Sequence, residues 1–326
     1  MNILVCGGAG YIGSACARVL LEAGHRVTVY DALLTGHRAA VPAEAEFVQA
    51  NLADEARLAR TLGEGRFDAA MHFAAFIEAG ESMRDPGKYF HNNIGNSLAL
   101  IEAVSRAGIP RFVFSSTAAV YASSDEPLHE GSALGPSNVY GQTKLMIEQV
   151  LEWYARTRGL LYAALRYFNA AGALPGMGED HPGESHLIPL VLRVALGQLP
   201  HVQVFGSDYP TPDGTAIRDY IHIEDLISAH LLALEALDRE TQLVYNLGNG
   251  SGYSVREVIE VARRVTGHAI PVVDTPRRRG DAARLVASSE KIRRELGWTP
   301  RHPKLEVIVS SAWEWHRTHP KGYSTQ

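Results

Sequence analysis

The first half of the chain alternates short apolar runs with longer stretches in which apolar residues recur at helical spacing. Runs of this kind are typical of buried strands, and the stretches between them are typical of amphipathic helices. The expected strands are Ile3–Cys6, Arg26–Tyr30, Glu46–Gln49, Ala69–Phe73, Arg111–Ser115 and Leu161–Arg166. The expected helices span residues 12–23, 54–62, 88–107 and 140–158. This alternation predicts an α/β fold, a Rossmann-type doubly wound parallel sheet with helices on both faces.

The pattern changes after residue 170, where Pro, Gly and His become frequent through residues 172–186 and 206–214. Irregular segments of this composition predict loops and short elements in place of a regular βαβ series. We therefore expect a Rossmann domain over residues 1–170 and a smaller C-terminal α/β domain over residues 171–326. The boundary is soft, because the apolar run Leu243–Leu247 is a further strand that is able to return to the main sheet.

Composition narrows the functional classes. The chain has 326 residues, of which 46% are hydrophobic and 21% charged, and its formal net charge is −5. A nucleic-acid-binding protein needs a concentrated basic face, so we expect no nucleic-acid partner. No apolar run approaches the length of a membrane span and the N-terminus leads directly into a strand, so we expect no membrane association and a cytoplasmic location. The two cysteines, Cys6 and Cys16, exclude a disulfide framework and fit a reducing compartment.

A glycine-rich turn follows the first expected strand. Gly7, Gly10 and Gly13 lie in the sequence GGAGYIG, directly before the first expected helix. Glycines at this spacing allow a tight turn, a close approach of a pyrophosphate to the backbone, and close packing of helix on strand. The second expected strand ends at Asp31, whose carboxylate suits a ribose hydroxyl and repels a 2′-phosphate. The arrangement predicts a dinucleotide site that prefers NAD to NADP.

Tyr140 and Lys144 lie one helical turn apart in NVYGQTK and share a face of their expected helix. A phenol is a poor base at neutral pH, but a lysine ammonium and a cationic nicotinamide ring both stabilise the phenolate and would lower its pKa. Thr117 and Ser116 lie at the carboxyl end of the strand that starts at Arg111, the edge of an α/β sheet at which ligands bind. These residues predict a tyrosine base that works beside a nicotinamide, with a nearby hydroxyl to hold the oxygen of the substrate.

Several longer motifs together resemble the extended short-chain dehydrogenase/reductase family, and within it the UDP-glucose (UDP-galactose) 4-epimerases. They are GGAGYIG, HFAAFIEAGES, HNNIGNS, FVFSSTAAVYA, NVYGQTKLMIE, RYFNAAGA, FGSDYPTPDGTAIRDYIH and RRRGDAARL. The resemblance spans essentially the whole chain, and the FGSDYPTPDGT–RDYIH block is far more specific than the glycine turn.

The resemblance implies a chemistry and a set of site residues. A tyrosine removes the proton of the sugar 4-hydroxyl while the C4 hydride passes to NAD, the 4-keto sugar turns over, and the hydride returns to its opposite face. It implies Tyr140 as the base, Lys144 as its electrostatic partner and Thr117 as the hydroxyl contact. The expected NAD-binding residues are Gly7, Gly10, Tyr11, Ile12, Gly13, Asp31, Asn51, Leu52, Phe73, Ala74, Ala75, Asn92, Ser115, Tyr140, Lys144 and Phe168. The expected UDP-sugar-binding residues are Thr117, Asn169, His186, Leu187, Phe205, Arg218, Arg278, Asp281 and Leu285.

Departures from the family pattern limit what the resemblance implies. His186 takes the place of a substrate-contacting asparagine, and Ile77 takes the place of a lysine on the cofactor side. Leu285 matches the position whose size gates N-acetylated sugars, and leucine is intermediate between the restrictive and the permissive residues. Ala118 and Ala119 stand where related dehydratases carry an acid pair, so loss of water from the sugar has no evident catalyst.

Alternatives and assembly stay open at this point. The chain could act on another nucleotide sugar (a UDP-N-acetylhexosamine, a UDP-pentose or a UDP-uronate), or be a non-catalytic NAD-binding regulator. The family commonly dimerises through the helices that match residues 88–107 and 140–158, so we expect a homodimer. We expect no metal, because the family needs none and His222 and His230 lack the spacing of a metalloprotease helix.

Overall fold

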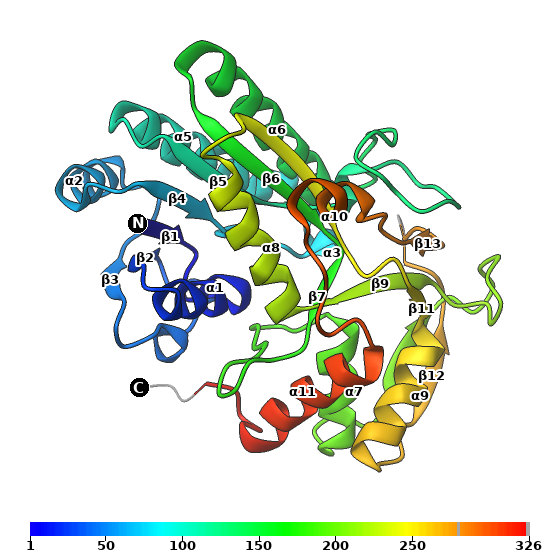
Figure 1. Cartoon of the computed structure of the whole chain (residues 1–326). Helices are drawn as coiled ribbons and strands as arrows, with labels where there is room; N and C mark the ends of the chain where they lie inside the picture. The colour runs from blue at the N-terminus through cyan, green and yellow to red at the C-terminus, as the bar shows by residue number, and fades with distance from the viewer. Residues whose placement is uncertain (279–280, 324–326) are drawn as a thin grey trace.

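The structure is a computed structural model that describes residues 1–278 and 281–323, so Arg279 and Gly280 of the RRRGD motif lie outside the described residues. At its centre is a seven-stranded sheet in the order β10-β6-β5-β4-β1-β2-β3, in which every pairing is parallel (Figure 1). Its strands are β1 (Asn2–Cys6), β2 (Arg26–Asp31), β3 (Glu46–Gln49), β4 (Ala69–His72), β5 (Arg111–Thr117), β6 (Leu161–Tyr167) and β10 (Gln242–Leu247). The expected doubly wound parallel sheet is confirmed.

The strand order reverses between β1 and β4, because the chain first builds β1-β2-β3 outwards and then returns to add β4 on the other side of β1. Neighbouring crossover connections leave opposite faces of the sheet at such a point, so the loops at the carboxyl ends of β1 and β4 separate. Ligands bind in the crevice that this leaves.

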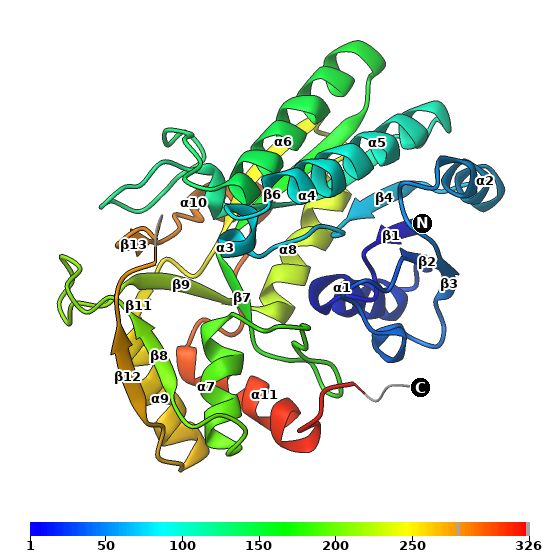
Figure 2. The ribbon, with the colours of Figure 1, turned by 180° about the vertical axis from the view of Figure 1, so that it is seen from behind.

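Helices cover both faces of the sheet. The main helices are α1 (Tyr11–Glu22), α2 (Glu55–Gly65), α3 (Ala79–Ser82), α4 (Pro86–Tyr89), α5 (Asn96–Arg106), α6 (Val139–Arg158), α7 (Leu187–Ala195), α8 (Ile223–Ala236), α9 (Val255–Thr266), α10 (Glu290–Leu296) and α11 (Leu305–Thr318). Successive side chains of a strand point to opposite faces. Ile3 and Val5 accordingly pack in one core with α1 and α8, whereas Leu4 and Cys6 pack in the other with α2, α5 and α6. Figure 2 shows α5 and α6 side by side on the second of these faces.

The helix expected over residues 88–107 is interrupted. A π-helical segment, η2 (Phe90–Gly95), joins α4 to α5, and short 3-10 segments are η1 (Arg38–Ala40) and η3 (Ala118–Val120). The buried side chain of Asn93 accepts from the N–H of Phe76 at 2.9 Å and donates to its carbonyl at 3.0 Å and to Thr143 at 3.2 Å. These tertiary hydrogen bonds hold the widened turn beside the loop after β4. Such π segments are frequent at functional sites.

The second region of the molecule is built from shorter pieces. β7 (Asn169–Ala171), β9 (Ile217–His222), β11 (Gly252–Ser254) and β13 (Arg284–Leu285) form a four-stranded sheet, and β8 (Val202–Phe205) pairs with β12 (Val272–Thr275). Their apolar side chains pack with α7, α9 and α11 in a third core. The strand expected at Leu243–Leu247 is present as β10 and lies in the main sheet. The preceding helix, α8, packs on the same sheet. Within the described part of the chain, no helix has the length and apolar character that crossing a membrane requires.

Candidate active site

The glycine turn between β1 and α1 is closed by backbone contacts that leave no room for side chains. Gly7 has φ +80°, and a Cβ built on it would lie 2.4 Å from the N of Ala74. A Cβ on Gly13 would lie 2.2 Å from the carbonyl oxygen of Gly7, whereas one on Gly10 meets only that oxygen, at 3.5 Å. The strand, turn and helix therefore pack tightly against one another, and Gly10 faces the free side of the turn.

The N-terminus of α1 is open to an anion. Among residues 1–278 and 281–323, no side chain caps this helix, and its first turn carries no acidic residue. Backbone N–H groups at such a terminus, together with the helix dipole, favour a phosphate group. The turn thus fits the pyrophosphate of a dinucleotide.

Asp31 lies beside this turn at the end of β2. Its Oδ2 accepts a hydrogen bond from the N–H of Ala9 at 2.9 Å, and its Oδ1 accepts one from the N–H of Leu33 at 2.8 Å. A carboxylate has about four acceptor sites on its two oxygens, so both retain capacity for a ribose hydroxyl. The residues present fit NAD, and the fixed negative charge disfavours a 2′-phosphate.

The other residues expected to bind the cofactor lie along the same edge of the sheet. Asn51 and Leu52 follow β3, Phe73 to Ala75 follow β4, Ser115 lies near the end of β5, and Phe168 follows β6. Asn92 lies in η2, and its Oδ1 accepts from the Nδ2 of Asn96 at 3.1 Å. Carboxyl ends of parallel strands share one edge, so the fold brings together residues that are spread over most of the first half of the chain.

Close packing brings the start of α6 to the end of β5. Asn138 caps α6 by accepting from the N–H of Gly141 at 2.8 Å. A Cβ on Gly141 would lie 2.2 Å from the carbonyl oxygen of Ala119, so only glycine lets α6 approach η3 this closely. As a result the Tyr140 side chain comes close enough to Thr117, the last residue of β5, for that hydroxyl to stabilise the phenolate.

Lys144 reaches the same place from the next turn of α6. Its Nζ donates to the carbonyl oxygen of Ser115 at 2.8 Å and lies 5.9 Å from the ring centre of Tyr140. The side chain is buried beside Phe114. The predicted base, lysine and hydroxyl are therefore neighbours at the carboxyl end of β5.

Burial dominates the acidity of this group in the protein alone. Burial raises the pKa of Tyr140 to about 12, and its hydrogen bond with Thr117 lowers that pKa only in part. Burial also lowers the pKa of Lys144 to about 7, against the opposing effect of Glu148. In the protein alone, desolvation of the phenol is the larger effect and the Lys144 ammonium is held by a carbonyl; the predicted lowering of the Tyr140 pKa refers to the state with a cationic nicotinamide bound and stays a prediction.

A buried ion pair lies behind Lys144. Arg166 donates to both oxygens of Glu148, from Nε at 3.0 Å and from Nη2 at 2.5 Å, and the side chains are 6% and 8% exposed. Ser116 donates to the same carboxylate. Glu148 is thereby fixed one helical turn beyond Lys144, where its charge favours the ammonium form of the lysine.

Most of the residues expected to bind the sugar nucleotide come from four short strands, β7, β8, β9 and β13, and from the loop before β13. Asn169 donates to the carbonyl of Asp219 at 3.0 Å, and Arg218 on β9 donates to that of Ala282 at 2.9 Å. Leu285 on β13 is the register partner of Arg218. In a separate contact, the guanidinium of Arg278 lies 4.6 Å from the ring centre of Phe205, and its Nε lies 3.0 Å from Asp281 Oδ2.

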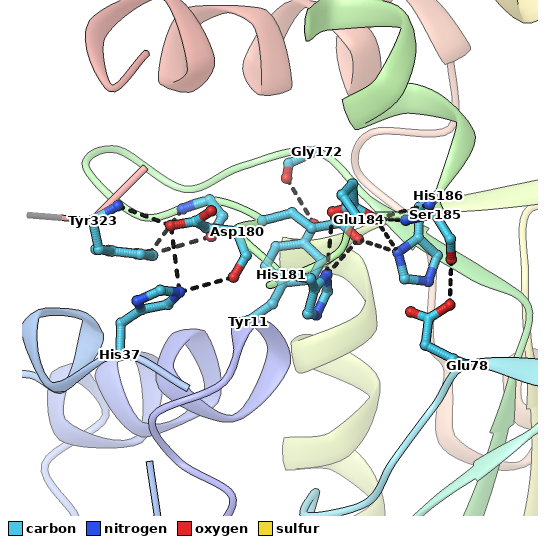
Figure 3. A network of polar contacts seen from close by, with 12 residues as sticks. Tyr11, His37, Glu78, Gly172, Asp180, His181, Glu184, Ser185, His186 and Tyr323 are labelled. Atoms are coloured by element: carbon cyan, nitrogen blue, oxygen red, sulfur yellow. Dashed lines mark hydrogen bonds and ion pairs between the residues drawn. The ribbon is translucent and has the colours of Figure 1, made fainter. Parts of the chain in front are cut away.

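His186 and Leu187 lie at the start of α7, below a loop that joins the two regions. In Figure 3, His186 lies beside Glu184 and His181, and its Nδ1 is 2.7 Å from Glu184 Oε1. The loop contacts the cofactor side through Tyr11, whose hydroxyl donates to the carbonyl of Gly172 at 2.7 Å. The side chain of Tyr11 thus links the phosphate-binding turn to the C-terminal half.

Most of the chain matches the sequence model of a known protein family. The sequence model of the NAD dependent epimerase/dehydratase family matches residues 3–248. The chain belongs to this family. The match begins in β1 and ends just after β10, so the family segment coincides with the seven-stranded sheet and the elements threaded between its strands.

This member of the epimerase/dehydratase family is similar in sequence to relatives over nearly its whole length. It is 50% identical over 314 residues to a UDP-glucose 4-epimerase of Corynebacterium glutamicum, covering 96% of this chain and 95% of the relative. A UDP-glucose 4-epimerase of Streptomyces lividans is 50% identical over 322 residues, with 98% and 97% covered. A crystal structure of the Brucella ovis UDP-glucose 4-epimerase in complex with NAD superposes with a TM-score of 0.92 at 44% identity, with 96% and 97% covered. The likeness to these proteins extends through the C-terminal half.

Some residues of the site were missed by reasoning from the sequence of this family member. Ser82 accepts a hydrogen bond from the N–H of Tyr140 at 3.1 Å, and no local pattern marks it. Glu148 lies four residues beyond Lys144, a helical spacing that could have indicated it. Glu179 and Glu184 contact His186, and their significance depends on how the loop folds. His222 caps α8 by accepting from the N–H of Glu224 at 3.2 Å.

Proposed function

We propose that this chain is an NAD-dependent 4-epimerase that interconverts UDP-glucose and UDP-galactose through a transient 4-keto sugar, an isomerase of galactose metabolism. The observation that carries the proposal is the meeting of Tyr140, Lys144 and Thr117 at the carboxyl end of β5, on the sheet edge that also carries the dinucleotide turn. Full-length relatives named UDP-glucose 4-epimerase support it. The hydroxyls of Tyr140 and Thr117 would face a sugar that reaches into the crevice between the two regions.

The cofactor would be held along the edge of the main sheet. Gly7, Gly10 and the start of α1 would receive the pyrophosphate, and Asp31 the adenosine ribose. Lys144 and Ser115 would lie on the nicotinamide side, next to Tyr140. When bound, NAD accepts a hydride from C4 of the sugar and later returns it, which makes the reaction redox-neutral overall.

The chain itself moves one proton. Tyr140 takes the proton of the sugar 4-hydroxyl and gives it back after the 4-keto sugar has turned over, while Thr117 donates a hydrogen bond to the reacting oxygen. The pKa of Tyr140, about 12 in the protein alone, must fall for this step, and a positive charge close to the phenol lowers it. The ammonium of Lys144, supported by Glu148, contributes part of that charge.

Binding affinity would come from the nucleotide and not from the sugar. A pyranose that must present both faces cannot be held tightly, so uniform binding energy belongs in the UDP group. Arg218 and Arg278 suit its phosphates because guanidinium groups pair with phosphate oxygens in a bidentate manner. Phe205 and Asp281 orient Arg278 by the contacts described above, and Asn169, His186 and Leu187 would lie nearer to the sugar.

We further propose that two copies pair through α5 and α6. These helices pack against each other on one face of the sheet, and each leaves a large apolar side chain in solvent. Leu98 on α5 is 44% exposed and Trp153 on α6 is 62% exposed, which supports burial against a second copy. Light scattering after gel filtration measures the mass, and a species with the mass of one chain would contradict the pairing.

The test of the function compares two Tyr→Phe variants on the same helix. Tyr140→Phe should reduce the rate of UDP-galactose conversion by roughly 10³-fold, because the proton acceptor is lost, while NAD stays bound. Tyr154→Phe removes a hydroxyl that bonds only to Glu102 at the surface, so its rate should stay within about twofold of the unmodified protein. A coupled assay of UDP-glucose formation measures both.

Three outcomes test the proposal against its alternatives. The unmodified protein mixed with UDP-galactose should show the absorbance of enzyme-bound NADH, which a non-catalytic NAD-binding protein would lack. If Tyr140→Phe kept a near-normal rate, the assignment of the base would be wrong. If UDP-N-acetylgalactosamine were converted much faster than UDP-galactose, the substrate assignment would be wrong while the base assignment stood.

A further inference from the structure

The loop between β7 and α7 gathers four side chains with metal-binding atoms. Glu179, His181, Glu184 and His186 lie within eight consecutive residues, and one ligand atom from each lies within 4.8 Å of all the others. Figure 3 shows His181, Glu184 and His186 pointing toward one another between the two regions of the molecule. The set contains two imidazoles and two carboxylates, a combination of ligands that zinc accepts.

The spacing of the ligand atoms matches a four-coordinate ion. Nδ1 of His181 lies 3.4 Å from Glu179 Oε1 and 3.3 Å from Glu184 Oε2, and Nδ1 of His186 lies 3.0 Å from Glu179 Oε1. Zinc bonds of 2.0–2.2 Å in a tetrahedron put neighbouring ligands roughly 3.3–3.5 Å apart. These three separations differ from the tetrahedral values by about 0.5 Å or less, whereas His186 Nδ1 lies only 2.7 Å from Glu184 Oε1 and would move away from it when an ion binds.

Burial makes positive charge necessary at this place. The side chains of Glu179 and Glu184 are 7% and 0% exposed, and two buried carboxylates close together require compensation. Two protonated imidazoles supply it, and so does one divalent cation bound to two neutral imidazoles. Both states are neutral overall, so exchange of two protons for one ion leaves no buried net charge. His186 is 39% exposed and offers a route from solvent.

We propose a structural site for a divalent transition-metal ion, preferably zinc, with four ligands: Glu179, His181, Glu184 and His186. Four protein ligands fill a tetrahedral shell, which is the form of a structural site and not of a catalytic one. The ion fixes the loop that bridges the two regions of the protein. His186 is also expected near the sugar, so the test measures metal binding alone and substitutes His181, which has no part in the proposed epimerase chemistry.

The loop has contacts on both sides that such an ion would hold in place. Asp180 forms an ion pair with His37 at 3.3 Å and accepts from the N–H of Tyr323 at 3.0 Å. Ser185 donates to Glu78, in the segment after β4. Asp180 and Ser185 each neighbour a ligand, so fixing the four ligands also fixes the loop over the phosphate-binding turn.

A second group of potential ligands, His222, Glu224 and His302, is less suited. Nδ1 of His222 already accepts from the N–H of Glu224 at 3.2 Å, and its Nε2 lies 3.0 Å from the Ser311 hydroxyl. With both ring nitrogens engaged, this histidine would have to break a helix cap or a buried hydrogen bond in order to bind an ion. A variant of this second group therefore serves as the control in the metal-binding experiment.

The experiment measures zinc binding to the NAD-loaded full chain without a histidine tag, after removal of metal by a chelator. Titration against a chromogenic chelator should show one molar equivalent of zinc for the unmodified protein. His181→Gln should weaken this binding at least tenfold, whereas His302→Gln should leave it unchanged. Circular dichroism and the content of bound NAD check that each variant is folded.

Cobalt provides a second measurement on the unmodified protein, which does not depend on a variant that folds. Co²⁺ added in place of zinc should give the intense visible absorption of a tetrahedral complex and should be displaced by zinc. The proposal is overturned if the unmodified protein binds no stoichiometric zinc and gives no such spectrum. It is also overturned if His302→Gln, and not His181→Gln, removes the bound ion.

Discussion

The two regions of the molecule position their parts of the site by different means. In the seven-stranded sheet, parallel ladders bring Asp31, Thr117 and Phe168 to one edge, since each residue lies at or just beyond the carboxyl end of a strand. In the C-terminal half the strands are shorter, with β13 spanning only Arg284–Leu285, so ladders alone do not hold the loops. Buried polar side chains hold these loops instead.

Asp219 is the clearest example in the C-terminal half. Its carboxylate accepts from the backbone N–H groups of Asn249 at 2.9 Å, Gly250 at 2.9 Å and Ala287 at 3.1 Å, and the residue is fully buried. Asp225 similarly accepts from the N–H groups of two residues of the loop before α11. One carboxylate thus ties together segments more than sixty positions apart in the sequence.

The two regions therefore have different roles in the proposed function. The regular half carries groups whose relative positions must not change during proton transfer, since ladder hydrogen bonds and helix packing are rigid. The looped half carries the groups that would bind the nucleotide, and it builds their positions one polar contact at a time. Loss of a group in the first half should therefore lower kcat, whereas loss of one in the second should alter binding or folding.

Of the variants that test this division between the regions, Lys144→Met should have the largest effect. With no ammonium near the phenol, kcat should fall on the order of 10²-fold or more, while the substrate affinity changes little. Steady-state kinetics on UDP-galactose measure both parameters. Lys291→Met is the matched control, because Lys291 also donates to a strand carbonyl, that of Val244 at 3.0 Å, but lies away from Tyr140. Equal losses in the two variants would show that a lysine bonded to a strand carbonyl, and not its position beside Tyr140, matters.

Asp219→Asn should mainly destabilise the fold. In the unmodified protein both carboxylate oxygens accept from backbone N–H groups. In the variant, either orientation of the amide places its NH₂ group against at least one of these N–H groups, which then has no acceptor. The free energy of unfolding should therefore drop by about 3 kcal/mol. Urea unfolding followed by circular dichroism measures it. The same change at the exposed Asp238, which pairs with Arg111 at the surface, should cost less than about 1 kcal/mol. A similar cost at both positions would contradict the idea that buried carboxylates organise the C-terminal half.

Arg218→Lys should have the smallest effect and the most selective one. Lysine keeps the charge but loses the bidentate geometry, so KM for UDP-galactose should rise about tenfold with kcat within about twofold. Arg264→Lys, on the surface beside Glu306, should leave both constants unchanged. A fall in kcat without a rise in KM would place Arg218 with the reacting groups and break the proposed division between the regions.

Much of the main sheet followed from the sequence, because its signals are local. Periodicity over a few residues predicted β3 at Glu46–Gln49 at its observed bounds, and predicted the other five early strands to within about two residues. The glycine turn and Tyr140–Lys144 were predicted for the same reason, since each is a short motif next to a recognisable element. Resemblance to a family, and not periodicity, suggested the residues of the C-terminal half.

Contacts between distant segments escaped the same reasoning. The π-helical turn η2 depends on hydrogen bonds of Asn93 with Phe76 and Thr143, which lie 17 and 50 positions away. The rise in the pKa of Tyr140 in the protein alone could not be predicted, because the burial of a phenol depends on everything packed around it. The four ligand atoms of the 179–186 loop meet only because that segment folds back on itself between the two regions.

The amino-acid sequence by itself determined the alternation of strands and helices, the phosphate-binding turn and the identity of the reactive side chains. Backbone propensity and hydrophobic spacing act over a few residues, and these features need nothing more. Tertiary structure alone decided how deeply those side chains are buried, which partners neutralise them and which loops meet above the cofactor edge. Desolvation and electrostatic interaction depend on distances in space, and the order of residues along a chain does not specify those distances locally.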